Sequence, residues 1–213
     1  MNRFQNIPTL GKLYLAASVA LSLIVFSNSV DPYNLSYTFK QTFFELGLWR
    51  PITGILYLSK LGFLLPFHLI FAVVAFSKGA GRMFGDRDKS GLLWIFLLST
   101  IALSIFSTFT GLYFFGSSFI MIVFMMWAIQ HPTDHIFLFN FAINSIYFPI
   151  IYAATMILLG SSFKHYMAGF LIGLLFGFIK NPTFIDKNGD IFPCPSFIKT
   201  YFQEDNRSLT LER

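Results

Sequence analysis

The chain has 213 residues, of which 55% are hydrophobic, 19% aromatic and only 12% charged, including 29 phenylalanines. A soluble domain needs more charge, so the composition predicts a membrane protein. The single cysteine excludes an internal disulfide framework and a multi-cysteine zinc site, and we expect no cofactor. The net charge of +5 comes from basic residues scattered at segment ends, which argues against a nucleic-acid partner.

Six apolar segments predict an all-α membrane protein, a bundle of six transmembrane helices. A hydrocarbon core of roughly 30 Å needs about 20 apolar residues per helix. The first segment follows Arg3 and Lys12 as in a signal peptide, but we interpret it as a retained span because its loss would unbalance the bundle. The predicted spans are residues 13–26, 61–76, 92–108, 113–129, 146–159 and 166–179. Residues 1–180 form the predicted membrane domain, and residues 181–213 a short cytosolic tail.

Between the first two spans, residues 31–50 mix aromatic side chains with Lys40 and Glu45. This mixture is typical of a segment at the headgroup level, so we predict that the first loop is interfacial. Trp49 and Arg50 are the last residues of this segment. Many membrane spans are flanked by an interfacial tryptophan and by an arginine whose side chain extends to the headgroups, so the two residues alone do not indicate a specific role.

The basic residues predict the topology. With both termini in the cytosol, that side carries eleven lysines and arginines, and the other side carries four: Lys40, Arg50, Lys60 and Lys164. This satisfies the positive-inside rule. Several predicted spans fall short of 20 residues, and short spans are accommodated by local thinning of the bilayer. Thinning is therefore a hypothesis at this stage.

The last span carries glycines at four-residue spacing, Gly169, Gly173 and Gly177. This spacing predicts a smooth ridge on one helix face, along which a neighbouring helix packs closely.

Polar residues within the spans suggest a hydrophilic groove. His68 lies in the second span, and Ser104 and Ser107 lie in the third. Ionisable residues inside a bilayer usually face protein or water. A histidine bonded to a neighbouring helix and serines that only permit close packing are the alternative interpretation.

Short motifs in a fixed order carry a family resemblance over residues 7–197. They are Ile7-Pro8, Trp49-Arg50-Pro51-Ile52-Thr53, Gly81-Arg82-Met83, Gly116-Ser117-Ser118-Phe119, Tyr147-Phe148-Pro149 and Gly169-Phe170-Leu171-Ile172-Gly173. The chain resembles the Derlin family, the rhomboid-like pseudoproteases of the endoplasmic reticulum (ER) membrane. The resemblance implies a rhomboid-like bundle and a role in ER-associated degradation, in which misfolded proteins are moved back to the cytosol.

The resemblance also assigns roles to individual positions. It implies that Trp49 and Arg50 anchor the interfacial loop against the bundle. Ser118 stands where rhomboid proteases carry their nucleophile, and Leu174 stands where they carry the histidine base. A serine without a base is a weak nucleophile, so we expect a protein that is not an enzyme.

The resemblance implies partners as well: misfolded ER polypeptides, a membrane ubiquitin ligase complex, the lipid bilayer and further copies of the chain in a homo-oligomer. The tail lacks the glycine-rich, arginine-containing box with which some Derlins recruit a cytosolic AAA ATPase, so we expect the ATPase to be recruited indirectly. Two alternatives are an active rhomboid-type protease using Ser118 and a small membrane transporter. The first lacks a visible base. The second lacks an internal repeat and, apart from His68, ionisable groups in its spans.

Overall fold

The computed structural model describes residues 7–84, 89–138 and 141–180, together with Pro195, Ser196, Ile198 and Thr200. Apart from these four residues, the predicted tail 181–213 lies outside the described residues, and so does the turn 85–88 after the second predicted span.

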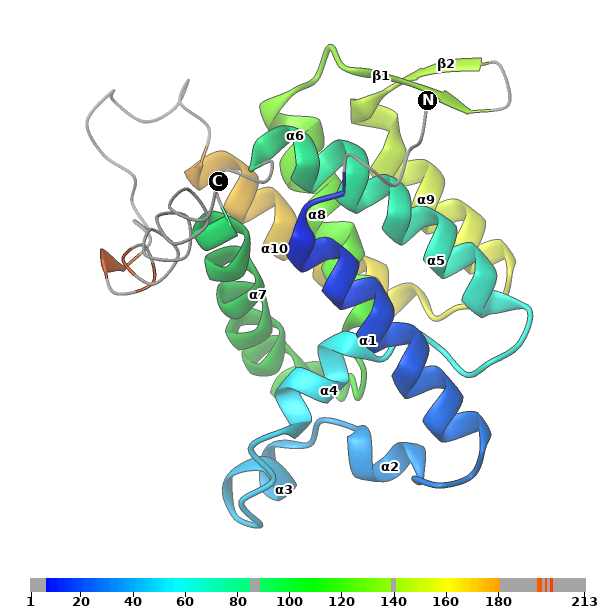
Figure 1. The fold of residues 1–213 in the computed structure, drawn as a ribbon, viewed down its shortest axis with the longest axis vertical. Coiled ribbons are helices and arrows are strands. Elements are labelled where there is room, and N and C mark those ends of the chain that lie inside the picture. Colours follow the sequence, from blue (N-terminus) through cyan, green and yellow to red (C-terminus); the bar gives the residue numbers. More distant parts are fainter. Residues whose placement is uncertain are drawn as a thin grey trace, which may run out of the picture.

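The described chain folds mainly into apolar helices that lie side by side (Figure 1). Each predicted span overlaps one of them, and the prediction of a mostly helical chain with several apolar helices is confirmed. They are α1 (Thr9–Phe26), α5 (Leu64–Val74) continued by the π-helix η2 (Ala75–Ala80) and α6 (Gly81–Met83), α7 (Lys89–Thr110), α8 (Gly116–Gln130), η3 (Ser145–Tyr147) continued by α9 (Phe148–Leu158), and α10 (Phe163–Ile179).

The helices differ in length. Three of the described helical segments, Thr9–Phe26, Leu64–Met83 and Lys89–Thr110, are long and apolar enough to cross a membrane. The segments Gly116–Gln130, Ser145–Leu158 and Phe163–Ile179 are apolar but shorter. Length and composition therefore support three crossings directly.

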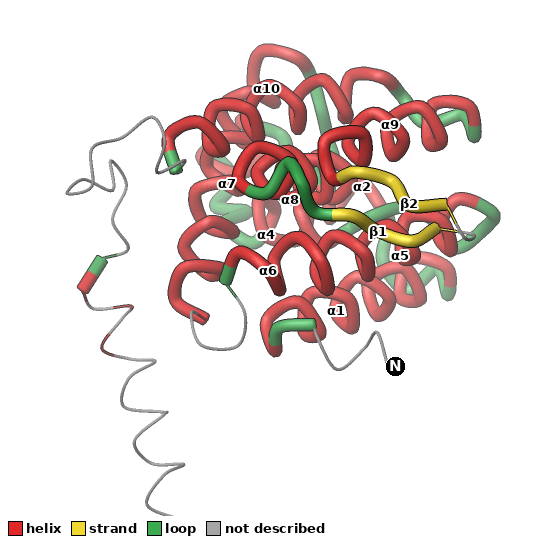
Figure 2. Tube along the Cα trace, turned by 90° about the horizontal axis from the view of Figure 1, so that it is seen from above, coloured by secondary structure: helices red, strands yellow, loops and turns green. Residues whose placement is uncertain are grey.

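Helix α8 forms the centre of the bundle. Its residues from Gly116 to Ala128 are all buried, as expected for a helix that is apolar on every face. The view along the bundle shows α8 among the other helices (Figure 2). The sequence predicted that this helix begins at residue 113. In the structure the chain turns at Gly111, residues 112–115 are not helical, and the helix begins at Gly116.

The connection between α8 and α9 lies between two predicted spans and contains a hairpin that the sequence analysis did not predict. In it, β1 (His135–Leu138) and β2 (Phe141–Asn144) pair antiparallel, with His135 opposite Asn144. Aromatic and β-branched residues, which favour strands, occupy half of these positions. The hairpin lies across one end of the bundle (Figure 2).

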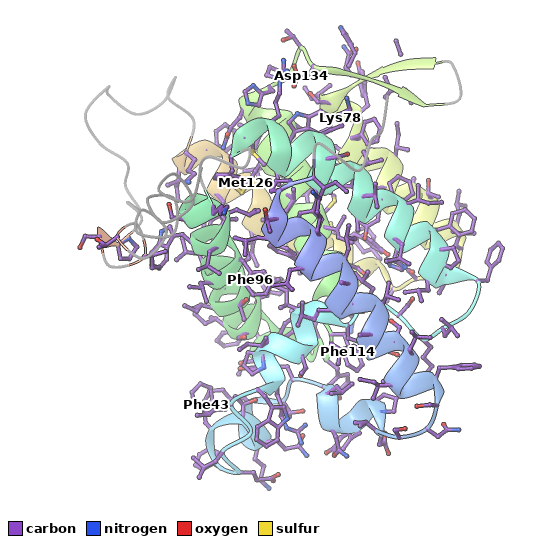
Figure 3. All side chains as sticks on the ribbon, viewed as in Figure 1. Phe43, Lys78, Phe96, Phe114, Met126 and Asp134 are labelled. Atoms are coloured by element: carbon purple, nitrogen blue, oxygen red, sulfur yellow. The ribbon has the colours of Figure 1, made fainter. Side chains whose placement is uncertain are left out.

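The two ends of the bundle are named by what lies there. At the hairpin end are the hairpin, Lys78 and Asp134; toward the other end lie Phe43 and Phe114 (Figure 3). Contacts show that α5, α8 and α10 run parallel. His68 meets Ser117 near their beginnings, Gly169 faces Ser118, and Gly79 and Gly177 face residues near the end of α8. All three helices therefore begin at the end opposite to the hairpin.

The segment predicted to be interfacial lies at that opposite end (Figure 1). It contains the short helices α2 (Pro32–Leu35) and α3 (Phe39–Phe43), and it leads into α4 (Arg50–Leu56). Helix α2 begins with proline at its first position, and the side chain of Asp31 accepts a hydrogen bond from the Tyr33 amide, so both features define its start.

Candidate functional site

Arg50 holds the interfacial segment together. Its side chain is buried, with 8% exposed, and Nη1 lies 3.0 Å from the carbonyl oxygens of Tyr33 and Ser36 and 2.9 Å from Oε1 of Gln41. One guanidinium group thus joins α2, the following turn and α3. Arginine suits this position because it offers several fixed donors and has no acceptor to satisfy.

Trp49, the other residue of the predicted anchor, is placed differently. Its side chain is 57% exposed, while its backbone carbonyl accepts hydrogen bonds from the amide and the hydroxyl of Thr53. The structure therefore places the internal contacts on Arg50 and leaves the indole of Trp49 on the surface.

Backbone hydrogen bonds tie this region to the bundle. The Tyr37 amide donates to the Tyr113 carbonyl at 2.9 Å, and the Phe115 amide donates to the Gly54 carbonyl at 2.7 Å. The interfacial segment is thereby joined to the turn that enters α8.

The three ridge glycines of α10 all face α8. A Cβ atom added to Gly173 would lie 2.7 Å from the Met125 Cβ and 2.9 Å from the Ile122 Cα, closer than real Cβ atoms come. Gly169 faces the backbone of Ser118, and Gly177 faces the side chain of Ile129. The two helix backbones therefore approach so closely that glycine is needed.

A cavity of about 270 Å³, with both polar and apolar residues in its lining, opens where α5, α8 and α10 begin. Its lining includes Phe114, which marks this end in Figure 3. We call it the α8 cavity. The polar residues lining it include Ser59, Lys60, His68, Ser117, His165 and Tyr166. None of the described residues that line it is an aspartate or a glutamate.

The α8 cavity contains a serine–histidine pair. The His68 Nδ1 lies 3.0 Å from the Leu64 carbonyl, which only accepts, so this nitrogen carries the proton. In the neutral ring Nε2 then bears the lone pair, and the Ser117 hydroxyl donates to it at 2.9 Å. Both residues are buried. This is the arrangement in which a histidine activates a serine.

The positions expected from the protease comparison are arranged differently. The hydroxyl of Ser118 donates to the backbone carbonyl of His165 at 2.8 Å, and Ser118 is fully buried. Leu174 is partly buried and packs against the core. The structure thus pairs a histidine side chain with Ser117, the residue before the position assigned to the nucleophile.

The two serines of α7 do not join His68. Ser104 and Ser107 are absent from the lining of the α8 cavity. The Ser107 hydroxyl donates to the Leu112 carbonyl, and the Ser104 hydroxyl is buried without a partner among the described residues. The structure therefore does not place these two serines in the cavity that His68 lines, and a groove shared by all three residues stays a prediction. The hydrogen bonds of His68 join it instead to the Leu64 carbonyl of its own helix and to the Ser117 hydroxyl of α8.

Two hydroxyl groups around the α8 cavity are unsatisfied. Tyr57 lines the cavity, is 4% exposed, and has no hydrogen-bond partner for its hydroxyl within the described residues; the same holds for the hydroxyl of Ser59. Burial raises the pKa of Tyr57 above its ordinary value, so this phenol remains protonated and able to donate. Buried polar groups without partners are rare and call for an explanation.

The hairpin end carries a different polar cluster, in which each member is paired. Asp134 contacts Nε of Arg82 at 3.2 Å and accepts from the indole nitrogen of Trp127 at 3.3 Å. The Ser145 amide donates to the Asp134 carbonyl at 2.8 Å, and the Ser145 hydroxyl donates to the His131 carbonyl. This cluster connects α6, α8 and the base of the hairpin.

Sequence reasoning missed Ser117, Tyr57 and Tyr166. Ser117 stands within a motif that was noticed, but the motif directed attention to its neighbour. His68 was singled out, yet its partner lies 49 residues away in the sequence. A polar residue in the second predicted span and a Ser-Ser pair opening the fourth were the available signals.

The fold and the site together define a helical membrane protein with a close-packed glycine interface and a cavity, partly lined by polar residues, at one end. The Der1-like family model matches residues 7–196, and the chain belongs to this family. The resemblance to the Derlins is thereby confirmed.

Curated relatives extend the match over nearly the whole chain. A protein of Dictyostelium discoideum named probable derlin-2 homolog is 26% identical over 207 residues, which cover 92% of this chain and 80% of that protein. Derlin-2.2 of Zea mays is 24% identical, with 95% and 86% covered, and Derlin-2 of Oryza sativa subsp. japonica shows the same values.

Proposed function

We propose that this protein is a non-catalytic component of ER-associated degradation that assists the retrotranslocation of misfolded proteins to the cytosol. Family membership supports a Der1-like role in degradation at the ER membrane. We further propose a rhomboid-like arrangement of six spans with both termini in the cytosol. In support, α1 begins and α10 ends toward the same end of the bundle (Figure 1).

The observation that carries the mechanism is the combination of short apolar helices with a cavity, partly lined by polar residues, at their ends. Helix α10, whose Leu171 and Leu175 side chains are exposed, has 17 residues and is about 26 Å long at 1.5 Å per residue, against a hydrocarbon core of roughly 30 Å. A bilayer that meets such helices thins locally. The α8 cavity adds polar surface where the thinned region begins.

Thinning and a polar surface act on the same barrier. Polypeptide backbone crossing hydrocarbon leaves polar groups unsatisfied, at several kcal/mol for each group. A shorter hydrocarbon path and hydrogen-bonding side chains along it both lower that barrier. The protein supplies the path, while a cytosolic AAA ATPase, recruited through a membrane ubiquitin ligase complex, supplies the driving energy. We propose misfolded ER polypeptides as the cargo.

The proposal is tested by deleting the gene and following a misfolded ER reporter. We expect its half-life to lengthen and to be restored by the wild-type chain. Purification of the full chain from gentle detergent is expected to bring down subunits of a ubiquitin ligase and an AAA ATPase. An unchanged reporter half-life, with neither partner recovered, contradicts the proposal.

One observation favours a second candidate function, serine hydrolysis. The contact between Ser117 and His68 gives Ser117 a histidine base, which Ser118 lacks. The matched test is labelling of the purified protein with a fluorophosphonate, comparing Ser117→Ala with Ser118→Ala. The hydrolase candidate requires labelling that Ser117→Ala abolishes and Ser118→Ala leaves intact. The non-catalytic proposal expects no labelling of any of the three proteins.

A further inference from the structure

The α8 cavity lies where three helices begin. Leu64 at the start of α5, Gly116 at the start of α8 and Ser162, the N-terminal cap residue of α10, all line it. None of these helices has a side-chain hydrogen bond at its cap or an acidic residue in its first turn. The first backbone N–H groups of a helix lack acceptors within the helix, and its dipole makes this end positive. Three such ends converge here without a carboxylate to balance them.

The side chains around the cavity match this polarity. The buried hydroxyl of Tyr57 has no partner within the described residues, so it retains a proton to donate. Lys60 adds a positive charge and is exposed at the surface. With no aspartate or glutamate among the described lining residues, the site offers hydrogen-bond donors and one cation, Lys60, to a ligand. Such a surface is complementary to an anion rich in oxygen.

The position of the cavity indicates the source of that anion. It is bordered by Pro32 of α2, in the segment that carries the exposed aromatic side chains of Phe39, Phe43 and Trp49. Exposed aromatic residues beside apolar helices mark the boundary between hydrocarbon and headgroups. At this level the abundant oxygen-rich anion is the phosphate of membrane phospholipids.

We propose that the α8 cavity binds the phosphate group of a phospholipid, with Lys60 pairing with its charge and Tyr57 donating a hydrogen bond. The first turns of α5, α8 and α10 supply the surrounding positive potential. The cavity volume of about 270 Å³ accommodates a headgroup, while the acyl chains remain in the bilayer. This site goes beyond the proposed function and does not depend on it, because a chain that fails in degradation assays is still able to bind lipid.

The test uses native mass spectrometry of the full chain in detergent, titrated with phosphatidylglycerol. Diacylglycerol with the same acyl chains, which lacks the phosphate, is the ligand control. We expect one phosphatidylglycerol molecule to bind each chain more tightly than any further phosphatidylglycerol molecules do. Diacylglycerol is expected not to replace it. Lys60→Glu is expected to weaken this binding about tenfold or more, and Tyr57→Phe severalfold. Lys78→Glu makes the same charge change at the hairpin end and is expected to have no effect.

A second arm distinguishes the source of the phosphate. Inorganic phosphate at millimolar concentration, added without lipid, is expected to leave the melting temperature unchanged and not to displace the bound phospholipid. If inorganic phosphate alone stabilises the protein and displaces the lipid, the ligand is free phosphate and the lipid assignment is wrong. Equal binding by wild type, Lys60→Glu and Tyr57→Phe overturns the site itself. So does binding of a peptide with a free C-terminal carboxylate when phosphatidylglycerol does not bind.

Discussion

The two ends of the bundle are built on different principles. At the hairpin end, Asp134 is paired with Arg82 and Trp127, and the hairpin covers the helices. At the cavity end, Tyr57 and Ser59 keep unpaired hydroxyls within the described residues, and three helix dipoles point their positive ends at a cavity. At the hairpin end the polar groups pair with one another, whereas at the cavity end some of them are left able to bind a ligand.

This difference locates function in the fold. An unsatisfied buried hydroxyl destabilises a protein by about 1–3 kcal/mol relative to a satisfied one. Native proteins keep such features mainly where a ligand, water or substrate meets them. We therefore attribute closure of the bundle to the hairpin end and contact with lipid or polypeptide to the cavity end.

The largest expected effect is on the free energy of unfolding, and it differs between glycine substitutions at the two ends of the ridge. A Cβ at Gly169, near the cavity, meets the Ser118 backbone and the Met121 Cβ, neither of which moves without shifting α8. A Cβ at Gly177, near the hairpin end, meets first the outer carbon of the Ile129 side chain, which is the far end of a flexible side chain and not backbone. We expect Gly169→Ala to lower the free energy of unfolding by about 3 kcal/mol and Gly177→Ala by less than about 1 kcal/mol. Equilibrium unfolding of the detergent-solubilised protein measures both, and equal losses contradict this asymmetry.

The next effect concerns Arg50 at the cavity end. Arg50→Ala removes the donor that three acceptors share, and we expect a loss of about 2 kcal/mol confined to the interfacial segment. Limited proteolysis within residues 31–50 measures this local loss. In cells, we expect the variant to slow degradation of the reporter more than it lowers the amount of protein. Arg50→Lys keeps the charge but not the fork of donors and serves as the control. If expression and reporter degradation fall equally, Arg50 is a folding residue only.

A smaller effect has the opposite sign. Tyr57→Phe removes a buried hydroxyl that has no partner among the described residues, so we expect it to raise the free energy of unfolding by about 1 kcal/mol in the absence of lipid. Tyr14→Phe is the matched control, because the Tyr14 hydroxyl donates to the Ile55 carbonyl at 2.9 Å. That variant is expected to lose about 1 kcal/mol. Thermal melting of both variants, delipidated and in detergent, measures these stability changes. If Tyr57→Phe destabilises the protein, the hydroxyl of Tyr57 has a hydrogen-bond partner and the prediction is wrong.

The helices could be predicted from the sequence because long apolar runs produce a strong signal. The partner of the glycine ridge could not, since spacing shows that a helix packs closely but not against which neighbour. In the structure, Gly169, Gly173 and Gly177 meet α8, whose apolar residues on every face gave no sign of orientation.

The centre of the site could not be predicted for a related reason. Successive residues on a helix point about 100° apart, so the choice between Ser117 and Ser118 depends on the rotation of α8 about its axis. Packing against α5 and α10 fixes that rotation, which directs Ser117 toward His68 and Ser118 toward the His165 carbonyl. The hairpin was missed because residues 135–144 are few and combine a strand-like pattern with polar flanks.

The smallest expected effect probes the closed end. The side chain of Arg82 is 64% exposed, and ion pairs at the surface contribute about 0–1 kcal/mol, so Arg82→Ala is expected to lower stability by less than about 0.5 kcal/mol. That difference is expected to vanish at high salt. Asp134→Ala is the informative partner variant. It also leaves the indole N–H of Trp127, a residue only 1% exposed, without its acceptor, so we expect a loss of about 1 kcal/mol that persists in salt. If both variants respond alike to salt, the Trp127 bond contributes nothing, and the hairpin end is closed by apolar packing alone.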